Sequence, residues 1–80
     1  MSDPELLFNK IVIVGAGTMG RGIAQVCAMA GYTTILNDIS EDTLTTAHKQ
    51  ILKNLAKGVE KGKVSAETQQ KALNNLSLSQ

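Results

Sequence analysis

Eighty residues are enough for one small domain at most. Eight basic residues nearly balance seven acidic ones, and the net charge of +1 gives no indication of a nucleic-acid or membrane partner. We find neither a signal peptide nor an apolar run long enough to span a bilayer, and therefore expect a cytoplasmic location.

The chain begins with residues 1–9, which we interpret as a leader whose apolar residues Leu6 to Phe8 are candidates to cover an edge of the core. An unbroken β-branched run from Ile11 to Val14 follows. Such a run is typical of a parallel strand buried on both faces. We therefore predict a central strand from Lys10 to Val14.

A glycine-rich loop, Gly-Ala-Gly-Thr-Met-Gly, comes directly after this strand and opens a helix. In a dinucleotide-binding loop Gly15 permits the tight turn, Gly17 lets a pyrophosphate approach the backbone, and Gly20 lets the helix pack close to the strand. The N–H groups of the first helical turn attract the phosphates. The alternative is a glycine turn with a purely structural role. The order strand, loop, helix favours dinucleotide binding.

The helix is predicted from Thr18 to about Ala30, with Gly31 as its stop. Four apolar residues recur at spacings of three and four and are expected to face the sheet: Ile23, Val26, Cys27 and Ala30. Ala24 and Ala28 are small, which allows close approach. We interpret Cys27 as a small core residue rather than a nucleophile. Gly22 weakens a helix interior, which suggests that either the cofactor or the neighbouring strand packs closely against it.

A second strand is predicted from Thr33 to Asn37, and Asp38 follows it. This carboxylate lies near the spacing at which a dinucleotide-binding domain holds the adenosine ribose. It would repel a 2′-phosphate, and neither Ile39 nor Ser40 is an arginine that could bind one, so NAD is favoured over NADP. Alternatively, Asp38 only caps the next helix, and the two roles are compatible.

A long helix is predicted from Glu41 to about Lys57, with Ser40 as its N-cap. Its apolar stripe comprises Leu44, Ala47, Ile51, Leu55 and Val59. Four lysines recur every four residues along one face: Lys49, Lys53, Lys57 and Lys61. This row is either a solvated surface or a basic flank for a polyanionic ligand. His48 is interpreted as structural or partly exposed.

Gly58 and Gly62 are expected to end the long helix in a turn, and Ser65 to cap a shorter helix over residues 66–75 with Ala72, Leu73 and Leu76 inward. Alternation in Leu-Ser-Leu-Ser predicts the start of a third strand. The fold class is therefore α/β: β-α-β-α-α-β, half of a Rossmann dinucleotide-binding domain, with parallel strands in the order 3-2-1. The first strand then has an open edge, which we expect a second copy, a swapped segment or the leader to cover.

Three segments together resemble one family: VIVGAGTMGRGIAQVCAMAGY, LNDIS and KNLAKGVEKGKVS. They are similar to the N-terminus of the NAD-dependent 3-hydroxyacyl-CoA dehydrogenases, most of all to the bacterial 3-hydroxybutyryl-CoA dehydrogenases. The resemblance implies an NAD domain followed by a helical dimerisation domain. It also implies interconversion of (S)-3-hydroxyacyl-CoA and 3-ketoacyl-CoA in fatty acid or butyrate metabolism. Residues 1–80 would then be part of the NAD domain only.

The resemblance assigns few roles within this chain. The pyrophosphate loop comprises Gly15, Gly17, Thr18, Met19 and Gly20, and Asp38 is the ribose carboxylate. Asn54 and Lys61 align with positions that meet the CoA nucleotide. The family's catalytic residues lie beyond position 80, and no metal is implied, so we expect no catalytic residue here and no activity from the 80-residue chain alone. The expected partners are NAD, an acyl-CoA substrate and further copies of the subunit.

Two other functions stay open at this stage. Flavoproteins also combine a strand, a glycine loop and a helix with an acid after the second strand, so an FAD enzyme is an alternative. The inserted helix pair with its lysines argues against it. A stand-alone nucleotide-binding fragment without catalysis is the other alternative.

Overall fold

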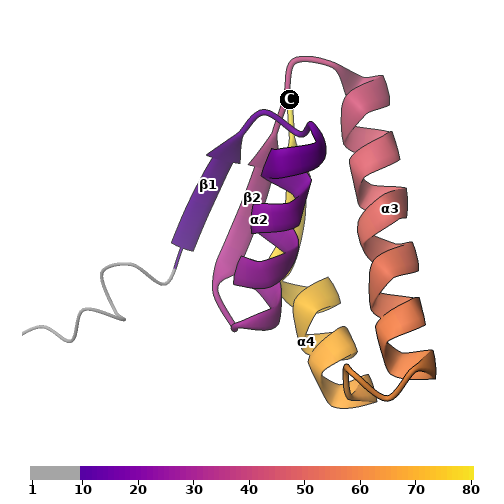
Figure 1. The fold of residues 1–80 in the computed structure, drawn as a ribbon. Coiled ribbons are helices and arrows are strands. Elements are labelled where there is room, and N and C mark those ends of the chain that lie inside the picture. The colour runs from indigo at the N-terminus through magenta and orange to yellow at the C-terminus, as the bar shows by residue number, and fades with distance from the viewer. Residues whose placement is uncertain (1–9) are drawn as a thin grey trace, which may run out of the picture.

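The computed structural model describes residues 10–80, which form three strands and three helices in the order β-α-β-α-α-β (Figure 1). The elements are β1 (Lys10–Val14), α2 (Thr18–Met29), β2 (Thr33–Asn37), α3 (Glu41–Glu60), α4 (Ala66–Asn75) and β3 (Leu76–Ser79). The expected element order is confirmed. The leader over residues 1–9 and the cover expected from Leu6 to Phe8 lie outside the described residues.

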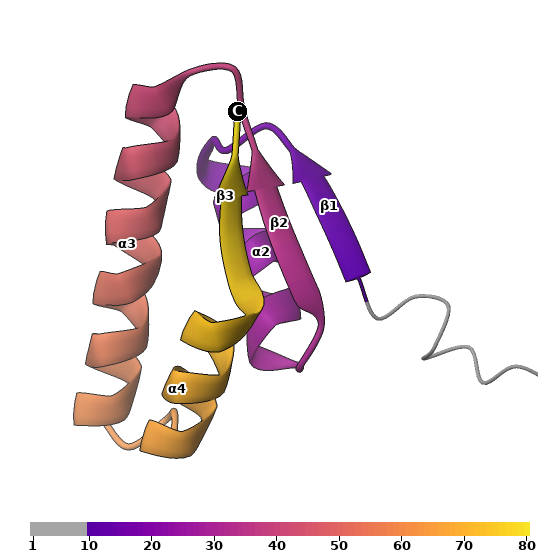
Figure 2. The same cartoon turned by 180° about the vertical axis from the view of Figure 1, so that it is seen from behind.

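The three strands form one parallel sheet with β2 in the middle (Figure 2). Lys10 of β1 is in register with Thr33 of β2, and Thr34 of β2 with Leu76 of β3. Parallel neighbours need long crossover connections, which α2 supplies for the first pair and α3 with α4 for the second. The predicted order 3-2-1 is therefore confirmed, and β1 lies at the outer edge.

One face of the sheet carries the helices and the other is bare in the described part of the chain. Both right-handed crossovers run in the same direction along the sheet, so their helices lie on the same side (Figure 2). Val12 is 57% exposed and Val14 is 81% exposed. The prediction that β1 is buried on both faces is therefore wrong for this chain, because no described element covers the second face.

Helix α2 packs on the sheet through small residues. Ala24 and Ala28 are fully buried, whereas Ile23 and Val26 are largely exposed and Cys27 is half-buried. The predicted inward face of α2 is therefore wrong, and Cys27 is not part of the buried core. Ala24 and Ala28 belong to the buried core, and Met29 at the end of the helix packs against it.

Helix α3 begins as predicted but ends later. The Ser40 hydroxyl accepts a hydrogen bond from the Thr43 N–H at 3.2 Å, and the stripe Leu44, Ala47, Ile51 and Leu55 is buried. The helix continues past Lys57 to Glu60, because Gly58 serves packing rather than termination. A Cβ on Gly58 would lie 2.6 Å from Val64 Cγ2, so the missing side chain lets the following turn fold back on the helix.

The last two elements match their predicted bounds. Ser65 caps α4 by accepting from the Thr68 N–H at 3.0 Å, and Ala72 is buried with Leu73 and Leu76 packed against the core. Strand β3 follows α4 without a loop. Among residues 10–80, no helix is long and apolar enough to cross a membrane.

Candidate nucleotide-binding site

The glycine loop lies at the carboxyl end of β1, where β1 passes into α2. Gly15 has φ +100°, a conformation that side chains rarely adopt. A Cβ on Gly20 would lie 1.9 Å from the Gly15 carbonyl oxygen, so only glycine allows this approach of helix to loop. A Cβ on Gly17 would meet no protein atom within 4 Å. The space beside Gly17 is therefore open for a ligand.

The N-terminus of α2 differs from those of the other two helices. Gly17 is its N-cap and makes no side-chain capping bond, and its first turn contains no acidic residue. Helix α3 has Ser40 as a cap with acids in its first turn, and α4 has Ser65 with Glu67. The first N–H groups of α2 have no partner within the helix. Together with the helix dipole they form a positive site for an anion.

Asp38 connects the glycine loop to the start of α3. One carboxylate oxygen accepts from the Ala16 N–H at 2.9 Å and the other from the Ser40 N–H at 2.8 Å. The bond from Ala16, followed by that from Ser40, lowers the pKa of Asp38, so the group is ionised at neutral pH. Each ionised oxygen can accept more than one hydrogen bond, which leaves capacity for ribose hydroxyls. Ser40, not Asp38, is the N-cap of α3, and Asp38 supports it by accepting from its N–H. Contact with a ribose and support of the helix start are both compatible with this geometry.

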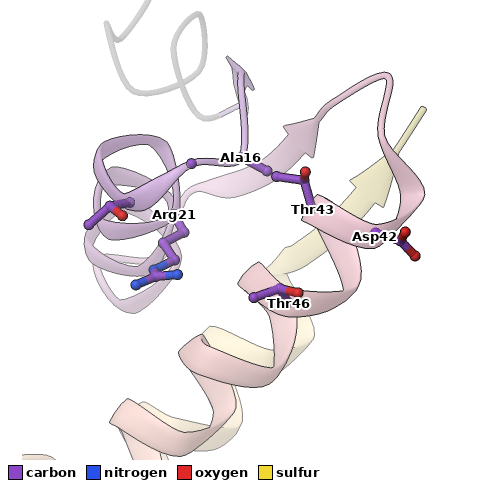
Figure 3. Close-up of a pocket in the computed structure, with 7 residues that line it drawn as sticks. Ala16, Arg21, Asp42, Thr43 and Thr46 are labelled. Carbon is purple, nitrogen blue, oxygen red and sulfur yellow. The ribbon is translucent and has the colours of Figure 1, made fainter.

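A cleft of about 270 Å³ adjoins the glycine loop and lies between α2 and α3 (Figure 3). Arg21 extends into the gap from α2, and Thr43 and Thr46 line it from α3 (Figure 3). Asp42 is also among the lining residues. Sequence reasoning missed Arg21 because the glycine pattern leaves this position free. Because the positive charge of Arg21 is balanced by the negative charge of Asp42, the charges of the cleft do not by themselves define an anion-binding site.

Ile39 is a second residue that sequence reasoning missed as part of the site. It follows Asp38 at the carboxyl edge of the sheet and is 93% exposed. A nearly bare isoleucine beside the Asp38 carboxylate offers an apolar surface on which an aromatic ring could lie. The signal was present in the sequence, since a large apolar residue stands in a loop directly after the acid.

The two residues that the resemblance predicts to meet CoA, Asn54 and Lys61, lie on α3 and at its C-terminal end, away from the glycine loop. The Asn54 amide donates to Gln25 Oε1 of α2 at 3.2 Å, and its carbonyl oxygen accepts from Gln50 at 2.9 Å. Lys61 is the exposed C-cap of α3, seven positions after Asn54 and on the same side of the helix. The other lysines of the row are exposed too, and His48 is half-buried as expected.

Three features define a dinucleotide-binding half-domain of the Rossmann class. They are a parallel sheet, a glycine loop that leads into an uncapped helix N-terminus, and an ionised carboxylate after the second strand. Residues 10–80 match the family 3-hydroxyacyl-CoA dehydrogenase, NAD binding domain. The chain belongs to this family, so the predicted resemblance and the choice of NAD as cofactor are confirmed at the level of the family.

Several relatives support the assignment. A 3-hydroxybutyryl-CoA dehydrogenase of Bradyrhizobium diazoefficiens is 43% identical over 70 residues, 88% of this chain and 24% of its own. A mitochondrial hydroxyacyl-coenzyme A dehydrogenase of Rattus norvegicus is 40% identical over 94% of this chain and 26% of its own. The crystal structure of (S)-3-hydroxybutyryl-CoA dehydrogenase from Ralstonia eutropha superposes with a TM-score of 0.84 at 33% identity, covering 90% of this chain and 25% of that one. The chain thus spans about a quarter of the length of these relatives.

Proposed function

We propose that this chain is the nucleotide-binding part of an NAD-dependent dehydrogenase that interconverts (S)-3-hydroxyacyl-CoA and 3-ketoacyl-CoA. The observation that carries the proposal is the uncapped N-terminus of α2 beside the open space at Gly17. Similarity to enzymes named 3-hydroxybutyryl-CoA dehydrogenase supports a short-chain substrate and a role in butyrate or fatty acid metabolism. A cytoplasmic location and assembly into a homo-oligomer stay predictions.

The residues present fit NAD. The backbone around Gly17, Thr18 and Met19 would hold the pyrophosphate, Gly15 and Gly20 keep the loop in its shape, and Asp38 would accept hydrogen bonds from the adenosine ribose. The adenine ring would lie against Ile39. The bound nicotinamide supplies hydride transfer, whereas this chain binds and orients the nucleotide. The expected absence of catalytic residues before position 80 implies that the 80-residue chain has no activity alone.

The acyl-CoA site is a second part of the proposal. Asn54 and Lys61 present an amide and a cation on one side of α3, and the neighbouring lysines extend the positive charge. This arrangement suits the phosphates of a CoA nucleotide. The alternative for the lysine row, a solvated surface, stays open, and a stand-alone nucleotide-binding module remains a second candidate function. An FAD enzyme is disfavoured by membership in the NAD-binding family.

Titration of the 80-residue chain with NAD and with NADP, followed by NMR, tests the nucleotide site. NAD is expected to shift the amide signals of Gly17 to Gly20, and NADP to bind more weakly because the Asp38 carboxylate repels a 2′-phosphate. Asp38→Ala is expected to weaken NAD more than NADP. Equal losses for both nucleotides would show that Asp38 does not contact the ribose.

A further inference from the structure

The Asp38 carboxylate is itself an anion held by the backbone. Its two oxygens accept from the N–H groups of Ala16 and Ser40 at 2.9 and 2.8 Å. Ala16 belongs to the glycine loop and Ser40 is the N-cap of α3, so donors from two separate segments converge on one charged group. Converging backbone N–H groups bind an anion whatever its source. Without the Asp38 side chain, both donors would be available to an anion of a ligand.

The cleft that contains Arg21 begins at the same place. Ala16, whose N–H is bonded to Asp38, is also one of the residues that line the cleft. Arg21 stands about one turn of α2 beyond Thr18, another lining residue, and extends into the gap toward α3 (Figure 3). The Arg21 guanidinium is therefore the cation that the fold brings to the side of the site where Asp38 is bound.

A nucleotide at the glycine loop would bring its adenosine ribose to this junction. In this class of domain the pyrophosphate lies at the helix N-terminus, and the carboxylate accepts from the ribose hydroxyls. NADP differs from NAD by one phosphate on the ribose 2′-oxygen. With Asp38 in place, that phosphate meets a second anion and is repelled. Without Asp38, it would lie among the donors that the carboxylate had used, at the entrance of the cleft.

We propose that Arg21 is a specificity-determining residue, which forms a subsite for a 2′-phosphate together with the Ala16 and Ser40 N–H groups, and that Asp38 blocks this subsite. The inference rests on the proposed function, because it requires a nucleotide at the glycine loop. Dinucleotide-binding domains that accept NADP hold its 2′-phosphate with a nearby arginine. Discrimination against NADP then depends chiefly on Asp38, since the groups around it favour a phosphate.

The charges explain why this subsite requires a phosphate that belongs to a bound nucleotide. Asp42 lines the cleft and Glu41 precedes it in the first turn of α3, so a free phosphate ion gains little from Arg21. A 2′-phosphate is positioned by the rest of the nucleotide, and it loses little further freedom when it binds. Arginine suits this role because its planar guanidinium can donate to two phosphate oxygens at once.

NMR titration of the 80-residue chain with NAD and with NADP tests the subsite through a series of variants. Asp38→Ala is expected to shift the ratio of the two affinities at least tenfold toward NADP. Arg21→Gln in that background should weaken NADP roughly tenfold and change the Kd for NAD less than twofold. Lys71→Gln in the same background is the matched control. It removes an equal charge from an exposed position of α4, outside the cleft, and should leave both Kd values unchanged.

Two further variants keep the test decisive. Circular dichroism checks that each chain is folded, and Asp38→Ser replaces Asp38→Ala as the background if the alanine variant unfolds. Arg21→Lys, which keeps the charge and loses the planar group, should bind NADP with an affinity between those of the arginine and glutamine forms.

The possible failures are distinguishable. Equal losses for NAD and NADP on Arg21→Gln, or no loss for either, would overturn the subsite while NAD binding by the wild type still supports the proposed function. A wild-type chain that does not bind NAD would contradict the proposed function, and the subsite with it. Weakening of NADP by Lys71→Gln as strong as that by Arg21→Gln would show a general effect of net charge and would also overturn the subsite.

Discussion

The contact between helix and loop at Gly20 makes a sharp prediction about stability. In Gly20→Ala the new Cβ would lie 1.9 Å from the Gly15 oxygen and 3.0 Å from its carbon. Both atoms belong to the backbone, so no side-chain rotation relieves the clash. Overpacking costs about 1–3 kcal/mol, and alanine regains about 0.5–1 kcal/mol in helix propensity. We expect a net loss of about 1 kcal/mol.

Gly22→Ala is the matched control, because it makes the same change two positions later in α2. A Cβ there would meet no protein atom within 4 Å, so the neighbouring strand does not pack closely on Gly22. Only the helix-propensity term applies, so this variant is expected to gain about 0.5–1 kcal/mol. Because both variants gain the helix-propensity term, they should differ by the overpacking cost alone, about 2 kcal/mol.

Thermal unfolding followed by circular dichroism, with all samples at the same low concentration, measures the difference. For a domain of this size 1 kcal/mol corresponds to about 4–8 °C in Tm, so the variants should differ by roughly 8–16 °C. The midpoint of Gly20→Ala lies below that of the wild type and the midpoint of Gly22→Ala above it. A Gly20→Ala chain as stable as the wild type would refute the close helix–loop contact.

Two further predictions concern charged groups. The hydrogen bonds from Ala16 and Ser40 lower the pKa of Asp38 in the folded state. The stabilisation by Asp38 is therefore present above its unfolded pKa of about 3.9, and it is lost as the pH falls through the folded pKa. The urea midpoints of wild type and Asp38→Asn should converge on acidification below about pH 4, and a gap that widens would contradict this. In an enzyme that carries this segment, Lys61→Ala should raise KM for acyl-CoA roughly tenfold with little change in KM for NAD. Equal changes in both KM values would favour the interpretation of the lysine row as a solvated surface.

The sequence predicts the element bounds well because the signals that set them are local. Ser40 and Ser65 each cap a helix within their own turn, and Gly31, at φ +101°, stops α2. The end of α3 is different, since Gly58 is needed for contact with Val64 six positions later. That contact depends on the path of the turn, which local propensity does not contain.

The orientation of α2 could not be derived from the size of its apolar residues. Spacing alone placed Ile23 and Val26 inward, whereas Ala24 and Ala28 are buried and Gly20 makes the close contact with the loop. These small residues recur every four positions, which is the signal that was available. The large residues Ile23 and Val26 are exposed in the part of the chain that the structure describes, which helical periodicity alone does not predict.

The parallel pairing of all three strands has a consequence for how the chain folds. Lys10 meets Thr33 and Thr34 meets Leu76, so every strand pair joins segments more than twenty residues apart, and no hairpin can nucleate the sheet. During synthesis the Asp38 N–H gains its bond to the Ser79 oxygen only after the helices between them have emerged. The carboxyl edge, where the nucleotide would bind, is therefore completed last. A fluorescent nucleotide added during refolding would then report the final docking of β3, and helical circular dichroism the steps before it.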